Sequence, residues 1–267
     1  MTLLVTGAKG FIGKNMMYRL NIHQVTGLDD DYFSELTWPD YLQNFLDAKK
    51  PTAVFHMGAC SDTLELDANY MMTRNYESTK IITDWCTKNK IPIVYSSSAA
   101  SYGENGEYPS NLYGWSKYVA EDYVVKSGGI ALRYFNVYGP GEEHKKEMAS
   151  VAYKAFLKKE SNEPNFLFPK KPQRDFVYVK DVVHANIHAW LNYDSLYGEA
   201  YDVGSGEPRG FEDVLELMNI SYEYCGEEMI PKGYQFYTCS DRNKWMRGWE
   251  PYYTLEKGLE DYISYLK

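Results

Sequence analysis

A chain of 267 residues, 44% of them hydrophobic, can form one large domain, or one domain with a smaller lobe, and this composition excludes wholesale disorder. The net charge of −9 argues against a nucleic acid or a membrane surface as a partner. The N-terminus is typical of a strand and not of a signal peptide, no apolar run reaches the roughly 18–20 residues of a membrane-spanning helix, and the four scattered cysteines lack metal-ligand spacing, so we expect reduced thiols, no metal and a cytoplasmic protein.

Short apolar strands alternate with helical stretches over the first half of the chain. Strands are predicted at 3–5, 24–28, 53–56, 93–96 and 130–134, with helices to about residue 22, over 39–49, over 70–89 and from about residue 112. This repetition, with nearly continuous apolar strands, is typical of a parallel sheet with helices on both faces. We therefore predict a doubly wound α/β fold of the Rossmann type, with residues 1–139 as the dinucleotide-binding core.

The pattern loosens after residue 139. Helices are predicted near 146–160, 181–193, 211–219 and 254–266, and strands near 175–179 and 199–203. We expect residues 140–267 to form mainly a smaller substrate-binding lobe over the C-terminal edge of the sheet, with some segments returning to the core. Residues 145–180 carry nine Lys or Arg against four acids, which favours a small anionic ligand, although most of these lysines taken singly are equally typical of a solvated helix face.

Three glycines follow the first predicted strand and open the first helix. Gly7, Gly10 and Gly13 have the spacing G-x-x-G-x-x-G. Gly7 permits a tight turn, Gly10 lets the backbone approach a pyrophosphate, and Gly13 lets helix and strand pack closely. The helix N-terminus then offers free N–H groups to the phosphates, so the loop predicts a dinucleotide site.

An acidic cluster ends the second predicted strand. Asp29 lies 22 residues after Gly7, where a carboxylate is expected to bind the adenosine ribose hydroxyls. Asp30 and Asp31 follow, and no lysine or arginine occurs between Arg19 and Lys49. Three carboxylates would repel a ribose 2′-phosphate, so we predict NAD as the cofactor rather than NADP.

A tyrosine and a lysine share one face of the helix that begins near residue 112. Tyr113 and Lys117 are four positions apart, and the serines 96–98 end a strand at the same edge of the sheet. A free phenol titrates near 10, and an adjacent ammonium together with an oxidised nicotinamide ring should lower that pKa toward neutrality, where a general base works best. We expect Gly114 to keep bulk away from the side on which the cofactor or sugar approaches.

These motifs together resemble the extended short-chain dehydrogenase/reductases that act on nucleotide sugars. The glycine loop, the sequence SSS-x-x-x-YG at 96–103 and Y-x-x-x-K at 113–117 carry this resemblance. Within the superfamily, the stretches 55–63, 112–117, 133–152 and 173–182 resemble the ADP-L-glycero-D-manno-heptose 6-epimerases, and the likeness extends over nearly the whole chain.

The resemblance implies a catalytic role for four residues. Tyr113 matches the family's acid/base, Lys117 the lysine that holds the nicotinamide ribose and tunes the tyrosine, and Ser98 the serine that bonds the reacting oxygen. Lys145 is similar to a second acid/base. Two proton-transfer groups suit an epimerase, because hydride leaves one face of the sugar carbon and returns to the other.

The resemblance also implies binding residues and an assembly. A nucleotide-diphosphate sugar is the expected partner, the protein is expected to be a homo-oligomer, and Arg174 resembles an arginine that clamps the diphosphate. The cofactor residues carried over are Gly7, Gly10, Phe11, Ile12, Gly13, Asp29, Asp30, Gly58, Ala59, Asn75 and Val137, beside Tyr113 and Lys117; the substrate residues are Ser98, Asn136, Lys145, Lys154, Phe168, Arg174 and Tyr234.

The chain departs from the family pattern at four places. The segment 30–52 is shorter and lacks the lysines that would bind a 2′-phosphate, which puts the family's usual NADP preference in doubt. Arg74 replaces an expected asparagine, Lys154 a histidine, and Glu147 a small serine that touches substrate. An acid is unfavourable beside a diphosphate, so the exact sugar stays open.

Other functions remain open at this point. A different nucleotide-sugar 4-epimerase or reductase shares the same motifs. Elimination is disfavoured, since the related dehydratases carry an Asp-Glu pair where this chain has Ala99 and Ala100. A cofactor-binding regulator without turnover would not need Ser98, Tyr113, Lys117 and Lys145 together.

Overall fold

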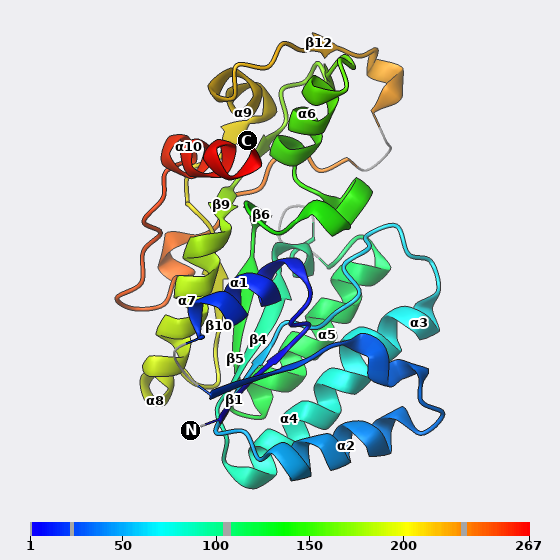
Figure 1. The fold of residues 1–267 in the computed structure, drawn as a ribbon, viewed down its shortest axis with the longest axis vertical. Helices are drawn as coiled ribbons and strands as arrows, with labels where there is room; N and C mark the ends of the chain where they lie inside the picture. Colours follow the sequence, from blue (N-terminus) through cyan, green and yellow to red (C-terminus); the bar gives the residue numbers. More distant parts are fainter. Residues whose placement is uncertain (1, 22–23, 104–107, 231–233) are drawn as a thin grey trace.

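A parallel β-sheet forms the centre of the molecule. The computed structural model describes residues 2–21, 24–103, 108–230 and 234–267. Among these residues, six parallel strands have the order β10-β5-β4-β3-β1-β2, which confirms the doubly wound α/β fold (Figure 1). The strands are β1 (Thr2–Thr6), β2 (Gln24–Leu28), β3 (Ala53–His56), β4 (Ile93–Ser98), β5 (Ile130–Tyr134) and β10 (Ala200–Val203).

Helices cover both faces of this sheet because successive strand residues point to opposite sides. Leu3 and Val5 pack toward one helical layer, and Leu4 packs toward the other. The first layer contains α1 (Phe11–Arg19) and α7 (Val179–Leu191), followed by the short α8 (Tyr193–Leu196). The second contains α2 (Trp38–Lys49), α4 (Ser78–Asn89) and α5 (Leu112–Lys126), with α3 (Ala68–Met72) before α4.

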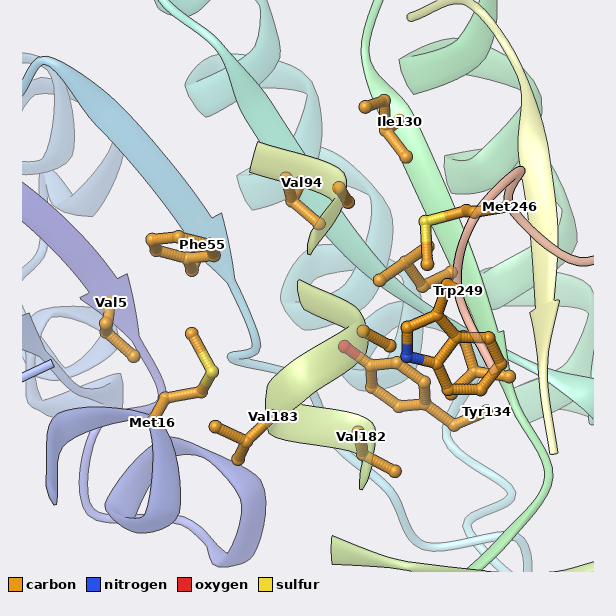
Figure 2. Packing of buried hydrophobic residues seen from close by; sticks show 14 of the residues in the cluster. Val5, Met16, Phe55, Val94, Ile130, Tyr134, Val182, Val183, Met246 and Trp249 are labelled. Atoms are coloured by element: carbon orange, nitrogen blue, oxygen red, sulfur yellow. The ribbon is translucent and has the colours of Figure 1, made fainter. Parts of the chain in front are cut away.

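The C-terminal half of the chain contributes to this core. Figure 2 shows Val183 of α7 beside Met16 of α1, and Trp249 against Tyr134 of β5, all within one apolar cluster. Strand β10 pairs with β5 at the edge of the sheet. Segments from both halves of the sequence therefore build the sheet and one of its helical layers.

A smaller lobe lies beyond the carboxyl ends of the strands (Figure 1). Its own apolar cluster contains Tyr178, Leu215 and Tyr262. The lobe has the helices α6 (Val151–Glu160), α9 (Phe211–Leu217) and α10 (Leu255–Leu266) and three two-stranded pairs: β6 (Asn136–Tyr138) with β9 (Phe176–Tyr178), β8 (Gln173–Arg174) with β11 (Arg209–Gly210), and β7 (Phe166–Leu167) with β12 (Glu223–Tyr224).

Three predicted helices differ from the observed ones. The first helix ends at Arg19, and its predicted end at residue 22 lies outside the described residues. The helix predicted over 146–160 begins only at Val151, because Lys146 has a left-handed φ of 48° and Ser150 caps the new helix by accepting a hydrogen bond from the Tyr153 N–H. The helix predicted over 70–89 starts at residue 68 and contains the π-helical turn Thr73–Glu77.

The described helices are all too short or too polar to cross a lipid bilayer. All four cysteines are free thiols. Within the ranges that the structure describes, His, Cys, Asp and Glu side chains do not come together in groups of three or more that could hold a metal ion.

Candidate active site

A pocket of about 260 Å³ lies where β1, β3, β4 and β5 end. This is the edge at which open α/β sheets bind ligands. The pocket brings together residues that are far apart in the sequence: Gly7, Gly10, Phe11, Ile12, Gly13, Met57, Gly58, Ala59, Ser61, Ser96, Ser97, Ser98, Tyr113, Lys117, Tyr134, Phe135, Val137, His144 and Lys145. All four predicted catalytic residues are among them, and so are eight further residues predicted to bind the cofactor.

The glycine loop has the geometry that a dinucleotide requires. Gly7 adopts a φ of +64°, and a Cβ on Gly13 would clash with the backbone oxygen of Gly7. Gly10 precedes α1 and provides no side-chain cap, so N–H groups of the first helical turn are available to a phosphate. The residues present thus fit the pyrophosphate of a nicotinamide dinucleotide.

The predicted ribose-binding acid stands beside this loop. Asp29 is largely shielded from solvent, and its Oδ1 accepts a hydrogen bond of 2.7 Å from the Lys9 N–H. The prediction that these acids stand without neighbouring cations is wrong, because two cations face them in the folded chain. Lys9 Nζ lies 3.0 Å from Asp31 Oδ2, and Arg74 Nη1 lies 3.4 Å from Asp30 Oδ2. The fold brings both cations in from outside the sequence window 19–49.

Helix α5 holds Lys117 beneath the pocket. Asn111 caps the helix by accepting a hydrogen bond of 2.8 Å from the Gly114 N–H. One turn later, Lys117 Nζ donates a 2.7 Å hydrogen bond to the Ser96 carbonyl and lies 4.9 Å from the centre of the Tyr95 ring. Burial lowers the pKa of Lys117 to about 7, and the charges of Cys60 and Glu121 oppose this only in part.

The phenol of Tyr113 differs from the prediction in its electrostatics. Burial raises the pKa of Tyr113, and a side-chain hydrogen bond with Ser98 lowers it by a smaller amount. Lys117 is not among the groups that shift this pKa, and Ser98 is the side chain that favours the phenolate. The protein side chains alone therefore keep this phenol protonated at neutral pH.

Lys145 reaches the pocket from a different element. It lies in the 3₁₀ helix Glu143–Met148, and its Nζ is 5.3 Å from the centre of the Phe11 ring. Burial lowers the pKa of Lys145, and Glu142 opposes the shift. His144 also lines the pocket and was missed by the sequence argument, although its place next to Lys145 in a basic stretch was a usable signal.

Two residues that were predicted to face the ligand instead support the fold. A Cβ on Gly114 would clash with the backbone oxygen of Ala100 and approach Pro109, so this glycine lets α5 pack closely and does not make room for a ligand. Asn75 is buried and does not line the pocket. Its side chain bonds both the N–H and the carbonyl of Cys60, at 2.7 and 2.9 Å, and thereby holds the loop after β3.

The predicted substrate residues of the lobe form a separate group. Arg174 is buried, its guanidinium lies 5.2 Å from the Tyr234 ring, and Phe168 packs edge-on against Tyr234 at 4.9 Å. Asn136 does not line the pocket, although its neighbours Phe135 and Val137 do, and its Oδ1 accepts a 3.1 Å hydrogen bond from Thr238. Lys154 donates to the backbone carbonyl of Glu147 at 3.2 Å.

A buried ionic network lies behind β4 and was not predicted. Arg133 donates two hydrogen bonds of 2.9 and 2.5 Å to Glu121 Oε1, and Glu121 Oε2 accepts one of 2.6 Å from Ser97. Tyr102 joins the network by donating to Asp202 at 2.7 Å. The network fixes α5, β4, β5 and β10 relative to one another. It includes Ser97, the residue that directly precedes Ser98.

The sequence of this chain matches a known family of enzymes. The profile of the NAD dependent epimerase/dehydratase family matches residues 3–204. The ADP-L-glycero-D-manno-heptose-6-epimerase of Brachyspira hyodysenteriae is 35% identical to this chain, and the match covers 99% of this chain and 98% of that protein.

Solved structures resemble the fold over its full length. The ADP-L-glycero-D-manno-heptose-6-epimerase of Helicobacter pylori has a TM-score of 0.85 at 25% identity, covering 99% of this chain and 96% of its own. The UDP-glucose 4-epimerase of Thermotoga maritima has a TM-score of 0.83 at 22% identity, covering 100% and 98%, which supports the fold alone. Together with the glycine loop and the Tyr113–Lys117 pair in one pocket, these matches show that the chain belongs to the NAD dependent epimerase/dehydratase family and is an isomerase of that family.

Proposed function

We propose that this protein inverts C6 of an ADP-linked heptose, with NAD as its resident cofactor. One observation carries the proposal. Tyr113 and Lys145, two partly buried groups that can each hold a proton, line the same pocket, and they come from α5 and from the 3₁₀ helix Glu143–Met148. An epimerase needs two such groups, because it must handle the proton of one hydroxyl on each face of the reacting carbon. The full-length relative supports the sugar assignment.

The glycine loop, Asp29 and Lys117 would hold the cofactor, which when bound supplies hydride acceptance and return at the sugar carbon. NAD is favoured because Asp29 is held ready to bind a ribose hydroxyl. Lys117 would bind the nicotinamide ribose with the ammonium protons that the Ser96 carbonyl does not accept.

The side chains of this chain can move the protons of the reaction. Ser98 would hydrogen-bond the reacting oxygen. Tyr113, whose phenolate would be favoured by Ser98 and by the positive charge of an oxidised nicotinamide, would take the proton of that oxygen as hydride leaves. The carbonyl group so formed turns over within the pocket. Lys145 would then donate a proton on the opposite face as hydride returns, and a lowered pKa suits this exchange, because the ammonium gives up its proton more readily. Arg174 would pair with the diphosphate, which fixes the nucleotide while the sugar turns.

Incubation with the two C6 epimers of an ADP-heptose, followed by proton NMR, tests the substrate. Interconversion of the epimers supports the proposal, whereas inversion at C4 of UDP-glucose in a parallel reaction would identify a 4-epimerase. Tyr113→Phe should lower the epimerisation rate by about 10²–10⁴-fold and leave NAD binding unchanged, because only the ionisable oxygen is lost. A regulator without turnover predicts no reaction in any arm and no difference between the two proteins.

A further inference from the structure

One buried carboxyl group closes the loop 139–150, which connects β6 to α6 and carries Lys145. Glu142 is fully buried, and its Oε1 accepts a hydrogen bond of 3.2 Å from the Gly139 N–H at the start of the loop. At the end of the loop, Ser150 donates to the same carboxyl group from its N–H at 2.5 Å and from its Oγ at 2.7 Å. The Lys145 N–H donates to the Glu142 carbonyl at 2.9 Å. Both ends of the loop and the backbone of Lys145 are therefore held by one residue.

The C-terminal helix α10 supplies a fourth hydrogen bond to this carboxyl group. Tyr262 is fully buried in the apolar cluster of the lobe, and its hydroxyl donates to Glu142 Oε1 at 3.0 Å. A buried carboxyl group is costly unless hydrogen bonds replace those it made to water. The four donors provide that replacement, and they come from the start of the loop, from its end and from α10.

Helix α1 holds the same loop from the side of the glycine turn. The Asn15 side chain donates from Nδ2 to the Pro140 carbonyl at 2.8 Å and to the Phe11 carbonyl at 3.0 Å. Phe11 also provides the ring whose centre lies 5.3 Å from Lys145 Nζ. The ammonium therefore lies against a helix of the sheet layer, at the end of a loop whose shape Glu142 sets.

The backbone directly after Lys145 is strained. Lys146 has a φ of 48° and a ψ of −119°, a combination that residues with a side chain rarely adopt. Such a residue keeps its conformation only where the surrounding contacts hold it, and strain of this kind concentrates at functional sites. The hydrogen bonds of Glu142 to both ends of the loop provide this hold.

We infer that Glu142 is a positioning residue for Lys145 and that Tyr262 connects the C-terminal helix to the active site through it. The inference rests on the proposed function, in which Lys145 and Tyr113 exchange protons on opposite faces of the sugar carbon. Loss of the carboxyl group should release the loop, and a reacting group displaced by about 1 Å can lose about 10²-fold in rate. Because each proton-transfer group deprotonates a different C6 epimer, this loss should affect one epimer and not the other.

Rapid mixing of the NAD-loaded chain with each C6 epimer of the ADP-heptose tests this asymmetry. The absorbance of the reduced nicotinamide reports hydride removal from the sugar, and Lys145→Met identifies the epimer that Lys145 deprotonates. Glu142→Gln places an amide nitrogen against the Ser150 N–H, so it should slow hydride removal from that epimer by about 10²-fold and from the other by less than about twofold. Equal slowing for the two epimers would overturn the inference.

Amine labelling of the chain without any ligand gives a readout that does not depend on turnover. Mass spectrometry of the labelled peptides distinguishes the half-buried Lys145 from the exposed Lys146, which serves as the internal reference. Lys145 should be labelled faster in Glu142→Gln and in Tyr262→Phe, because a released loop exposes its amine, whereas labelling of Lys146 should not change. Unchanged labelling of Lys145 in both variants would also overturn the inference.

The neighbouring glutamate and tyrosine are matched controls. Tyr265 lies one turn after Tyr262 on α10 and donates a 2.9 Å hydrogen bond to Glu143, and both of these residues are exposed. Glu143→Gln and Tyr265→Phe should leave hydride removal from both epimers, and the labelling of Lys145, as in the parent protein. Tyr262→Phe keeps the carboxyl group and decides the matter if Glu142→Gln does not fold. A parent protein that does not interconvert the epimers would instead refute the proposed function, and the labelling would still test the hold of Glu142 on the loop.

Discussion

At the residue scale, the buried ammonium of Lys117 makes the stability of the fold depend on pH. It is buried and hydrogen-bonded to a backbone carbonyl, and the fold holds its pKa at about 7, far below the usual 10.5. Between these two values the unfolded chain binds one more proton than the folded chain. The free energy of unfolding must therefore rise with pH in that window, and the full penalty of the buried charge applies below pH 7.

Comparison with Lys117→Met isolates this contribution. Without added ligand, the free energy of unfolding of the wild-type chain should rise by roughly 2 kcal/mol relative to that of the variant between pH 7 and pH 9. Each unit of pH contributes at most about 1.4 kcal/mol. Urea denaturation at several pH values measures the difference. Lys126→Met should give a pH-independent difference, because its ammonium is exposed. A constant difference for Lys117→Met as well would show that the buried ammonium titrates normally.

At the scale of elements, two glycines of the β1–α1 connection have different tasks: Gly13 is needed for packing and Gly10 for binding the cofactor. A Cβ on Gly13 meets the backbone of Gly7 and Ala8, which cannot yield, whereas a Cβ on Gly10 lies 3.1 Å from the Gly7 oxygen, a contact that a small shift relieves. Gly13→Ala should therefore destabilise the fold by about 2–3 kcal/mol. Gly10→Ala should keep its stability and bind NAD more weakly. Denaturation and NAD titration of both variants check this, and equal loss of stability would contradict it.

The elements also show what the sequence could predict. The strands of the main sheet were predictable because β3 and β4 are nearly continuous apolar runs between turn signals. The two- and three-residue strands β6, β8 and β11 were not, since so short a segment shows no periodicity.

The candidate site was predictable where its residues lie in one motif, as Tyr113 and Lys117 do. The charges facing Asp30 and Asp31 were not, because Lys9 and Arg74 reach these acids only through the tertiary fold. The contribution of Lys117 to the pKa of Tyr113 was mispredicted for a related reason. Spacing indicates which groups share a helix face, but it does not show how deeply each is buried.

At the scale of the whole molecule, one carboxylate joins the lobe to the sheet. Asp175 is fully buried and accepts hydrogen bonds from Ser205 N–H, Ser205 Oγ, Gly206 N–H and Ser240 N–H at 2.5, 2.7, 3.0 and 2.8 Å. These residues follow β10 and precede the segment that packs Trp249 into the core. Asp175 directly follows Arg174, so it anchors the backbone that carries the side chain proposed to bind the diphosphate.

Asp175→Asn should lower the free energy of unfolding by about 3 kcal/mol, because the amide cannot accept all four bonds and leaves buried N–H groups without partners. It should also raise the KM for the nucleotide sugar more than it lowers kcat. Asp194→Asn, at an exposed position of α8, is the control. Unfolding and steady-state kinetics of the two variants decide the matter, and a wild-type melting temperature for Asp175→Asn would refute this role.

The pairing of β10 with β5 has a consequence for how the protein is made. As the chain leaves the ribosome, β5 emerges long before residues 200–203, and until then its outer edge presents unpaired backbone groups. The apolar face that α7 later covers is uncovered over the same interval. Nascent chains of this protein therefore pass through a long aggregation-prone stage that ends only when three quarters of the polypeptide has been translated.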